Sequence, residues 1–172
     1  MSDGMSDGMS GAPVKVKPKP KGLERPSTTK VIKAMSSLHT RLYRVSGGRI
    51  GKNWRIGAAV RKAVPVCLVT TVGRKSGQPR TVPLCFLQDG DAVVLVASQG
   101  GLPTNPQWYF NLKANPEVQI EIGRQRRAYR ARVAGREERA RLWPRLVELY
   151  ADYDSYQSWT DREIPVVVCE PA

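Results

Sequence analysis

Short runs of β-branched and other apolar residues fill the second half of the chain and predict a series of strands. Residues 65–72 and 81–87 are rich in valine and leucine and are bounded by glycine or proline, as strands are. Residues 92–97 are apolar at successive positions, which is typical of a strand buried on both faces. Residues 118–122 alternate apolar and polar side chains, and 124–133 continue as a glycine turn and a strand.

Helical spacing of apolar residues appears between and after these strands. It predicts short helices over residues 105–115, 136–150 and 153–160, with Pro144 breaking or kinking the second. A last apolar strand is predicted over 164–169. Antiparallel strands interrupted by short helices are typical of a small, mainly β barrel rather than of a βαβ fold.

The first 62 residues have a different character. Residues 1–26 combine Met-Ser-Asp-Gly repeats with a Lys-Pro-rich stretch and predict a disordered basic arm. Residues 27–62 predict an amphipathic helix, begun by Ser27 or Thr28, and a glycine-containing connection. Residues 63–172 would then form the folded domain. The apolar positions of the helix are spaced 4-3-4-3 along one face: Val31, Met35, Leu38, Leu42 and Val45.

That helix has three possible roles. With its basic residues it could lie on an anionic membrane, cover a hydrophobic site, or pack on its own domain with a solvated basic face. The sequence does not choose among them. It has no run of about 20 apolar residues that would span a bilayer and no apolar core of a secretion signal. We therefore expect a cytoplasmic protein, with peripheral contact at the inner face of the cell membrane as a hypothesis.

The formal net charge of +13 is unevenly distributed. Residues 1–62 hold 14 Lys and Arg against three acidic residues, whereas residues 63–172 hold 14 against 12. The folded part is thus nearly neutral, which argues against a domain whose surface follows a nucleic-acid backbone. The three cysteines are scattered within apolar runs and favour a reducing compartment, and the single histidine makes metal or Ser-His-Asp catalysis improbable.

Two groups of residues carry candidate chemistry. The turn at 73–80, Gly-Arg-Lys-Ser-Gly-Gln-Pro-Arg, places three cations and two glycines between strands. It is either an anion site for a phosphate or carboxylate, or a solvated basic turn. Tyr150, Tyr153 and Tyr156 are spaced to share one face of a helix. Their phenols could hydrogen-bond a substrate or supply a proton, or the rings could simply pack.

Three segments in order change this balance: residues 69–80, residues 105–116 with Asn-Pro-Gln-Trp-Tyr-Phe-Asn, and residues 156–170. Together they resemble the deazaflavin-dependent nitroreductase family, whose members use reduced coenzyme F420. The resemblance implies a split β-barrel of the FMN-binding type. It also implies an oxidoreductase that transfers a hydride from F420 to an electron-poor quinone, enone or nitro compound.

The resemblance also implies roles for individual residues. The cofactor's phosphate and glutamate tail would be bound by the turn, and its ring system by the following strand and by two further segments. The implied cofactor-binding residues are Arg74, Lys75, Ser76, Arg80, Thr81, Val82, Pro83, Leu84, Cys85, Ala97, Ser98, Gln99, Trp108, Tyr109, Asn111 and Tyr153. Tyr153 and Tyr156 would orient or protonate the acceptor, with Ser98 bonding a polar substituent, so these three are the expected catalytic residues.

Two positions depart from the family pattern. Cys85 stands where some members have a tyrosine beside the substrate, which bears on nitroimidazole reduction. Gln99 stands where a lysine often follows the serine, which bears on tail-length preference. Two alternatives remain: a related barrel using FMN or haem, and a basic nucleic-acid-binding barrel. With F420 as cofactor, the expected partners are a small-molecule acceptor and an anionic membrane, without nucleic acid.

Overall fold

The computed structural model describes residues 16–20, 38–46, 49, 53–54 and 63–172. Its strands are β1 (Asn53–Trp54), β2 (Val64–Val72), β3 (Pro79–Asp89), β4 (Ala92–Val96), β5 (Glu117–Ile122), β6 (Gln125–Val133) and β7 (Val166–Pro171). Its helices are the 3-10 helix η2 (Gln99–Gly101), then α2 (Gln107–Ala114), α3 (Arg136–Leu149) and α4 (Asp152–Ser158). Residues 38–45 are also helical.

Six of these strands close into an antiparallel barrel. The order β2-β3-β4-β7-β6-β5 returns to β2, where Leu68 pairs with Glu121 and Thr70 with Gln119. The predicted mainly β barrel with helices is therefore confirmed. Closure leaves no free edges along the paired regions, because each strand finds a partner on both sides there.

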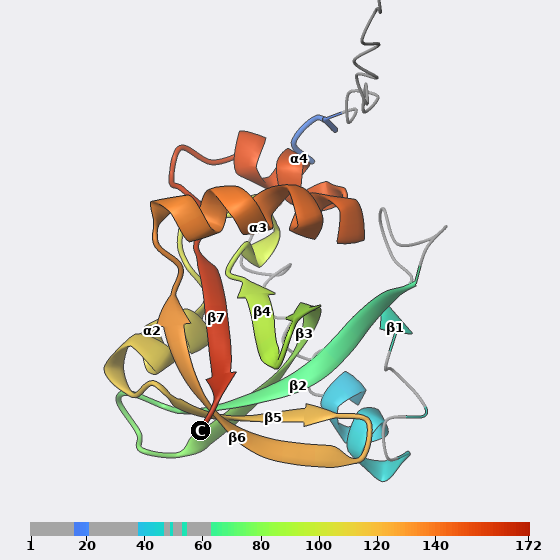
Figure 1. Cartoon of the computed structure of the whole chain (residues 1–172), viewed down its shortest axis with the longest axis vertical. Coiled ribbons are helices and arrows are strands. Elements are labelled where there is room, and N and C mark those ends of the chain that lie inside the picture. The colour runs from blue at the N-terminus through green and yellow to red at the C-terminus, as the bar shows by residue number, and fades with distance from the viewer. Residues whose placement is uncertain (1–15, 21–37, 47–48, 50–52, 55–62) are drawn as a thin grey trace, which may run out of the picture.

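Two apolar clusters hold the domain together. One fills the barrel interior and continues onto α2 through residues such as Trp108 and Leu112. The other lies between the outer face of β4 and β7 and the two helices α3 and α4, with Leu142, Leu146 and Ile164 fully buried. Figure 1 shows α3 and α4 crossing one end of the barrel over β4 and β7. The unbroken apolar run of β4 follows from this double burial.

Two helix predictions need correction. Helix α3 runs through Pro144 without interruption from Arg136 to Leu149, so of the two expected effects of that proline, a break or a kink, the break is wrong. The break falls instead at Tyr150, whose extended backbone (φ −145°, ψ 94°) ends α3 before α4 begins. As a result, Tyr150 does not share a helix with Tyr153 and Tyr156.

The helix at 38–45 contacts the domain through a different face from the one its pattern suggests. Tyr43 is buried, and its hydroxyl accepts the Gly123 N–H at 2.7 Å. Arg44 forms an ion pair with Glu121 at 2.6 Å. The predicted seam, in contrast, is exposed: Leu38 by 60%, Leu42 by 44% and Val45 by 83%. Packing of the helix on its domain through that seam is therefore wrong for this part of the helix.

Other expectations lie outside the described residues. These are the Met-Ser-Asp-Gly repeats, the start of the amphipathic helix with Val31 and Met35, and the glycine connection at 47–48 and 51. Among the described residues, no helix combines the length and apolar character needed to cross a membrane.

Candidate active site

The barrel opens between β3 and β4. Their pairing begins at Asp89 with Ala92 and ends at Phe86 with Leu95, whereas β3 continues to pair with β2 from Cys85 to Pro79. Beyond Leu95, β4 stays with β7 as far as Val96. The two strands therefore separate. A pocket of about 190 Å³ lies where they separate. Pro83, Leu84 and Cys85 line it from β3, and Val96 and Ser98 line it from the end of β4 and the residues that follow. The remaining lining residues are Val66, Gly100, Tyr150, Tyr153 and Tyr156.

The β2–β3 turn is held by its own backbone. Gly73 donates to the Gln78 carbonyl at 2.8 Å, and the Gly77 N–H donates back to the Gly73 carbonyl at 2.7 Å. Gly77 adopts a φ of 65°, which favours glycine. A Cβ on Gly73 would come within 2.7 Å of the Ser76 hydroxyl oxygen. The glycines thus permit a compact turn, on which Arg74, Lys75 and Arg80 are exposed.

Asn111 of α2 ties this turn to the barrel. Its amide oxygen accepts the backbone N–H of Arg74 at 3.2 Å, and its amide nitrogen donates to the Thr71 hydroxyl at 3.2 Å. The Asn111 side chain is buried and its hydrogen bonds are used within the protein. We therefore assign Asn111 the positioning of the turn rather than direct contact with a ligand.

The cations of the turn lack carboxylate partners. Arg74 bonds only neutral amides, those of Gln107 and Asn111, and stacks over Phe110 at 5.2 Å. Lys75 and Arg80 are exposed, and no side chain among the described residues pairs with either. Several other arginines, in contrast, form ion pairs: Arg44 with Glu121, Arg130 with Glu117, Arg132 with Glu138 and Glu170, and Arg141 and Arg145 with Asp89. The uncompensated charge at 74–80 favours the anion site over a merely solvated turn.

The segment 97–101 forms the opposite rim of the split. Gln99 has a left-handed backbone with φ 48°, which is uncommon for a residue with a side chain. Its amide oxygen is buried with no hydrogen-bond partner among the described residues. Gly101 is packed so closely on α4 that a Cβ would lie 2.9 Å from the Tyr156 carbonyl oxygen. A strained residue with an unsatisfied buried acceptor is common where a ligand completes the structure.

Arg162 braces this rim, a role that the sequence did not reveal. Its guanidinium donates to the carbonyls of Ala97, Ser98 and Leu102 and, at 2.7 Å, to the side-chain oxygen of Asn105. All four acceptors are neutral and lie about 60 residues away along the chain. No local signal distinguishes such an arginine from a surface one.

We expect Arg162→Ala to lower the free energy of unfolding by roughly 2–4 kcal/mol, because three carbonyls and an amide lose a charged donor. Denaturant titration measures this. Arg136→Ala, at the exposed start of α3, is the matched control and should stay within about 0.5 kcal/mol of wild type. Equal stability of both variants would show that the brace contributes nothing.

The three tyrosines do meet, although they come from two elements. The Tyr150 and Tyr153 rings lie 5.1 Å apart and the Tyr150 and Tyr156 rings 6.1 Å apart. The hydroxyls of Tyr150 and Tyr156 share a hydrogen bond of 3.1 Å. Burial raises the pKa of all three phenols. They are therefore neutral O–H groups at physiological pH, suited to donating a hydrogen bond or a proton.

Cys85 lies in the pocket beside these phenols. Burial raises the pKa of its thiol to about 12, so the thiol stays protonated near neutral pH. Because the thiolate is the nucleophile, we expect iodoacetamide to alkylate Cys85 slowly at pH 7, and the rate to rise about tenfold per pH unit up to at least pH 9.5. Mass spectrometry of the labelled peptide follows this. A plateau at pH 9, as for an ordinary cysteine, would contradict the assignment.

Other residues implied by the resemblance lie apart from the pocket. Trp108 and Tyr109 are buried in the barrel-interior cluster, and Val82 packs against it. The Thr81 hydroxyl bonds that of Thr70 at 2.8 Å and accepts from Arg44 at 3.2 Å. Ala97, the first residue of the rim segment, is fully buried. Ser76 is exposed on the turn with Arg74. The structure thus brings Pro83, Leu84, Cys85, Ser98, Tyr153 and Tyr156 together in one pocket.

Part of the basic arm contacts α4, the helix that carries Tyr153 and Tyr156. Lys17 forms an ion pair of 2.5 Å with the buried Asp152, and its backbone N–H donates to Ser155. The Trp159 indole donates to the Lys17 carbonyl at 2.7 Å. Figure 1 shows residues 16–20 beside α4. Residues 16–20 of the predicted arm thus contact α4, which supplies partners that the sequence could not indicate.

These features fit a deazaflavin cofactor with an anionic tail. The uncompensated cations of the turn suit phosphate and carboxylate groups, and the split between β3 and β4 adjoins an unsatisfied acceptor at Gln99. From Arg80 to Cys85, five residues of extended strand span about 17 Å, a length that suits a ring at one end and a tail at the other.

Comparison with known proteins agrees with this fit. Residues 35–171 match the family model described as F420H(2)-dependent quinone reductase. The F420H(2)-dependent quinone reductase Rv1261c of Mycobacterium tuberculosis is 46% identical over 134 residues, which are 76% of this chain and 86% of that protein. A second M. tuberculosis protein whose name assigns it to the same reductases, Rv3178, is 52% identical over 117 residues, 68% of this chain and 98% of its own.

Solved structures give the same answer. An F420-H2 dependent reductase, FDR-A, is 45% identical and superposes with a TM-score of 0.58, covering 62% of this chain and 94% of that one. A structure described as a domain-swapped dimer is 39% identical with a TM-score of 0.59, covering 76% of this chain and 98% of that one. The chain belongs to the F420H(2)-dependent quinone reductase family, and is an oxidoreductase whose hydride donor is reduced coenzyme F420.

Proposed function

We propose that this reductase holds the F420 tail at the β2–β3 turn and reduces a quinone in the split between β3 and β4, beneath the tyrosines. The observation that carries the proposal is the arrangement at the two ends of one strand segment. At its start, Arg80 and the neighbouring turn residues Arg74 and Lys75 carry positive charges that no carboxylate among the described residues neutralises. At its end, Cys85 shares a pocket with the protonated phenols of the tyrosines. When bound, reduced F420 supplies the hydride, so the protein need only bind, orient and supply a proton.

Arg74, Lys75 and Arg80 would bind the anionic tail, and the backbone and side chains from Thr81 to Cys85 would line the ring. Asn111 and Arg162 would support cofactor binding indirectly. Asn111 holds the turn in place, and Arg162 holds the rim at Ala97 and Ser98. Trp108 and Tyr109 contribute by packing α2, which carries Asn111, against the barrel.

Tyr156 is the group best suited to protonate the acceptor. Its hydroxyl is half-buried in the pocket and hydrogen-bonded to Tyr150, which can relay a replacement proton. The acceptor then gains the hydride from the cofactor and the proton from the phenol. Tyr153 is almost fully buried and packs against both rings, so we assign it the orientation of the pair.

The lining of the pocket favours a flat quinone over other acceptors. Val66, Pro83 and Val96 are apolar, while Ser98 and the phenols supply a few hydroxyls for carbonyl oxygens. Assays of the F420-loaded protein with menadione, cyclohexenone and a nitroimidazole test this. We expect the highest kcat/KM with menadione. Equal turnover of all three acceptors, or none with the quinone, would contradict the assignment.

We further propose peripheral contact with an anionic membrane, where lipid quinones reside. It rests on the exposed seam of Leu38, Leu42 and Val45, with exposed Arg41 on the same helix. Co-sedimentation with phosphatidylglycerol vesicles should be reduced at least fivefold in Leu42→Ser/Val45→Ser, since burial of two aliphatic side chains is lost. Undiminished binding by that variant would refute this contact.

A further inference from the structure

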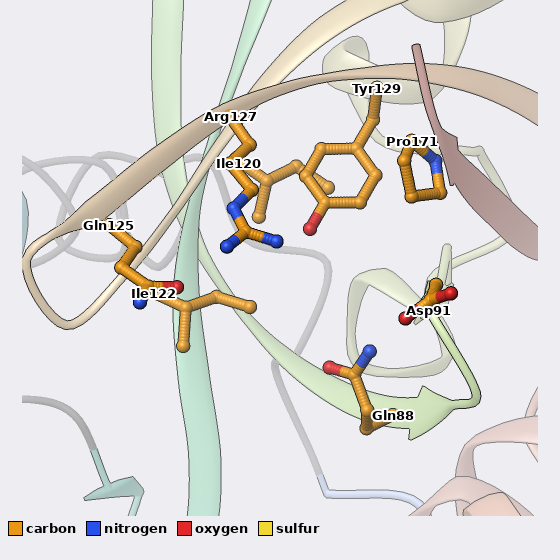
Figure 2. A pocket seen from close by; sticks show the side chains of 8 residues that line it. All are labelled: Gln88, Asp91, Ile120, Ile122, Gln125, Arg127, Tyr129 and Pro171. Carbon is orange, nitrogen blue, oxygen red and sulfur yellow. The ribbon is translucent and has the colours of Figure 1, made fainter.

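A second cavity opens at the other end of the barrel. It has a volume of about 500 Å³ and is lined by residues that include Gln88, Asp91, Ile120, Ile122, Arg127 and Tyr129 (Figure 2). Its walls come from the β3–β4 hairpin, the β5–β6 hairpin and the end of β7 at Pro171. This volume is in the range of small-molecule sites.

This cavity is separate from the candidate active site. The active site adjoins β3 from Pro83 to Cys85, whereas the second cavity lies beyond Phe86, near Gln88 and the hairpin that follows. Ile120 and Tyr129 form its floor and belong to the buried interior cluster, together with Phe86 and Val69. The packed barrel core therefore lies between the two sites.

Arg127 lies at the open end of the barrel. Along β6, Tyr129 and Ala131 are buried in the barrel, so the alternation of the strand puts the exposed Arg127 on the same face, toward the mouth of the cavity. The outward arginines of β6 all have partners: Arg126 bonds Gln119, Arg130 pairs with Glu117, and Arg132 pairs with Glu138. Arg127 has none among the described residues, and Figure 2 shows its guanidinium in the cavity.

Tyr129 adds a second donor beside it. Only 6% of the residue is exposed. Its hydroxyl points into the cavity near Arg127 and bonds no group among the described residues (Figure 2). The hydroxyl is accessible from the cavity, so a ligand there can bond it. A guanidinium and a phenol that converge on one space form a binding point for a carboxylate.

The far side of the cavity presents hydrogen-bond acceptors, whereas the side formed by β6 presents donors. Gln88 donates its amide N–H groups to the carbonyls of Gly90 and Ala92, at 2.8 and 3.2 Å, so its amide oxygen is left as an acceptor. The Asp91 carboxylate lies near it on the same hairpin. The apolar side chains of Ile120 and Ile122 line the same cavity.

We propose that this cavity binds a small hydroxyaryl carboxylate. The carboxylate would pair with Arg127 and Tyr129, the ring would lie over the isoleucines, and the hydroxyl would donate to Asp91 or Gln88. The acceptor rim disfavours a second negative charge on the ligand, which selects for monoanions over phosphates or dicarboxylates.

Calorimetric titration of the full-length protein with 4-hydroxybenzoate tests the proposal. We expect saturable binding that weakens at least about tenfold in Arg127→Gln, through loss of a charge-assisted pair. The neutral amide 4-hydroxybenzamide should also bind at least about tenfold more weakly. Arg126→Gln, on the outward face of the same strand, is the matched control and should bind as wild type does.

The active-site turn is itself cationic, so the titration is repeated with Arg74→Ala/Lys75→Ala. Unchanged binding of 4-hydroxybenzoate by that variant supports the barrel-end cavity. Binding that is lost there but kept in Arg127→Gln would overturn the proposal, as would the absence of saturable binding by the wild-type protein. Far-UV circular dichroism verifies that each variant is folded, and since the cavity is separate from the split, F420 affinity of Arg127→Gln should match wild type.

Discussion

Replacing Arg74 and Lys75 together by alanine is expected to raise the dissociation constant for F420 by one to two orders of magnitude. Because both side chains are exposed, the two lost charge-assisted interactions with the anionic tail are together worth about 1.5–3 kcal/mol. Neither is neutralised by a carboxylate among the described residues, so the whole of this attraction is available to a ligand. Fluorescence titration with F420 measures the change. The backbone bonds of Gly73, Gly77 and Asn111 remain in the variant, so the turn keeps its shape.

The ionic strength of the buffer separates this effect from loss of fold. The difference between variant and wild type should be largest at low salt and shrink as salt screens the exposed cations. Arg130→Ala, which removes an exposed arginine paired with Glu117, serves as the charge control and should bind F420 normally. An affinity loss that is the same at all salt concentrations would contradict an electrostatic role for the turn.

The second large effect is expected at Tyr156. Replacing it by phenylalanine keeps the ring packing against Tyr150 and Trp159 but removes the hydroxyl that faces the pocket. If this hydroxyl protonates the acceptor, kcat for quinone reduction should fall roughly 100-fold. The dissociation constant for F420 should hardly change, because the tail is bound elsewhere. Single-turnover kinetics with menadione distinguish the two quantities.

The Tyr150→Phe variant serves as a comparison for Tyr156→Phe. It removes the hydrogen-bond partner of Tyr156 but leaves the Tyr156 hydroxyl in place, so its kcat should lie between those of wild type and Tyr156→Phe. A wild-type kcat in Tyr156→Phe would mean that the proton comes from another source, such as water, and that the tyrosine cluster is only packing.

The strands and the active-site turn could be predicted because their signals are local. The β-branched runs on either side of residues 73–78 fold as β2 and β3, and the two glycines allow the turn between them. The meeting of Tyr150 with Tyr156 was anticipated, although for the wrong reason: a backbone break at Tyr150, and not a continuous helix, brings the rings together.

The parts that could not be predicted depend on contacts between distant segments. The seam of Leu38 and Leu42 indicates an apolar face, but the sequence does not say that Tyr43 on another face would supply the contact with the barrel. Arg162 resembles any surface arginine until its carbonyl partners at 97–102 are known. The position of Arg127 toward the mouth of the cavity follows only from the parity of β6 relative to the barrel axis.

The most direct test of the account compares F420 with the same deazaflavin lacking its phosphate and glutamate tail. Both are titrated into the wild-type protein at low salt, with binding followed by fluorescence. The account predicts that F420 binds and that removal of the tail weakens binding at least about tenfold, because the contacts with Arg74, Lys75 and Arg80 are lost. Equal affinity for the two compounds would contradict the assignment of the β2–β3 turn as the tail site.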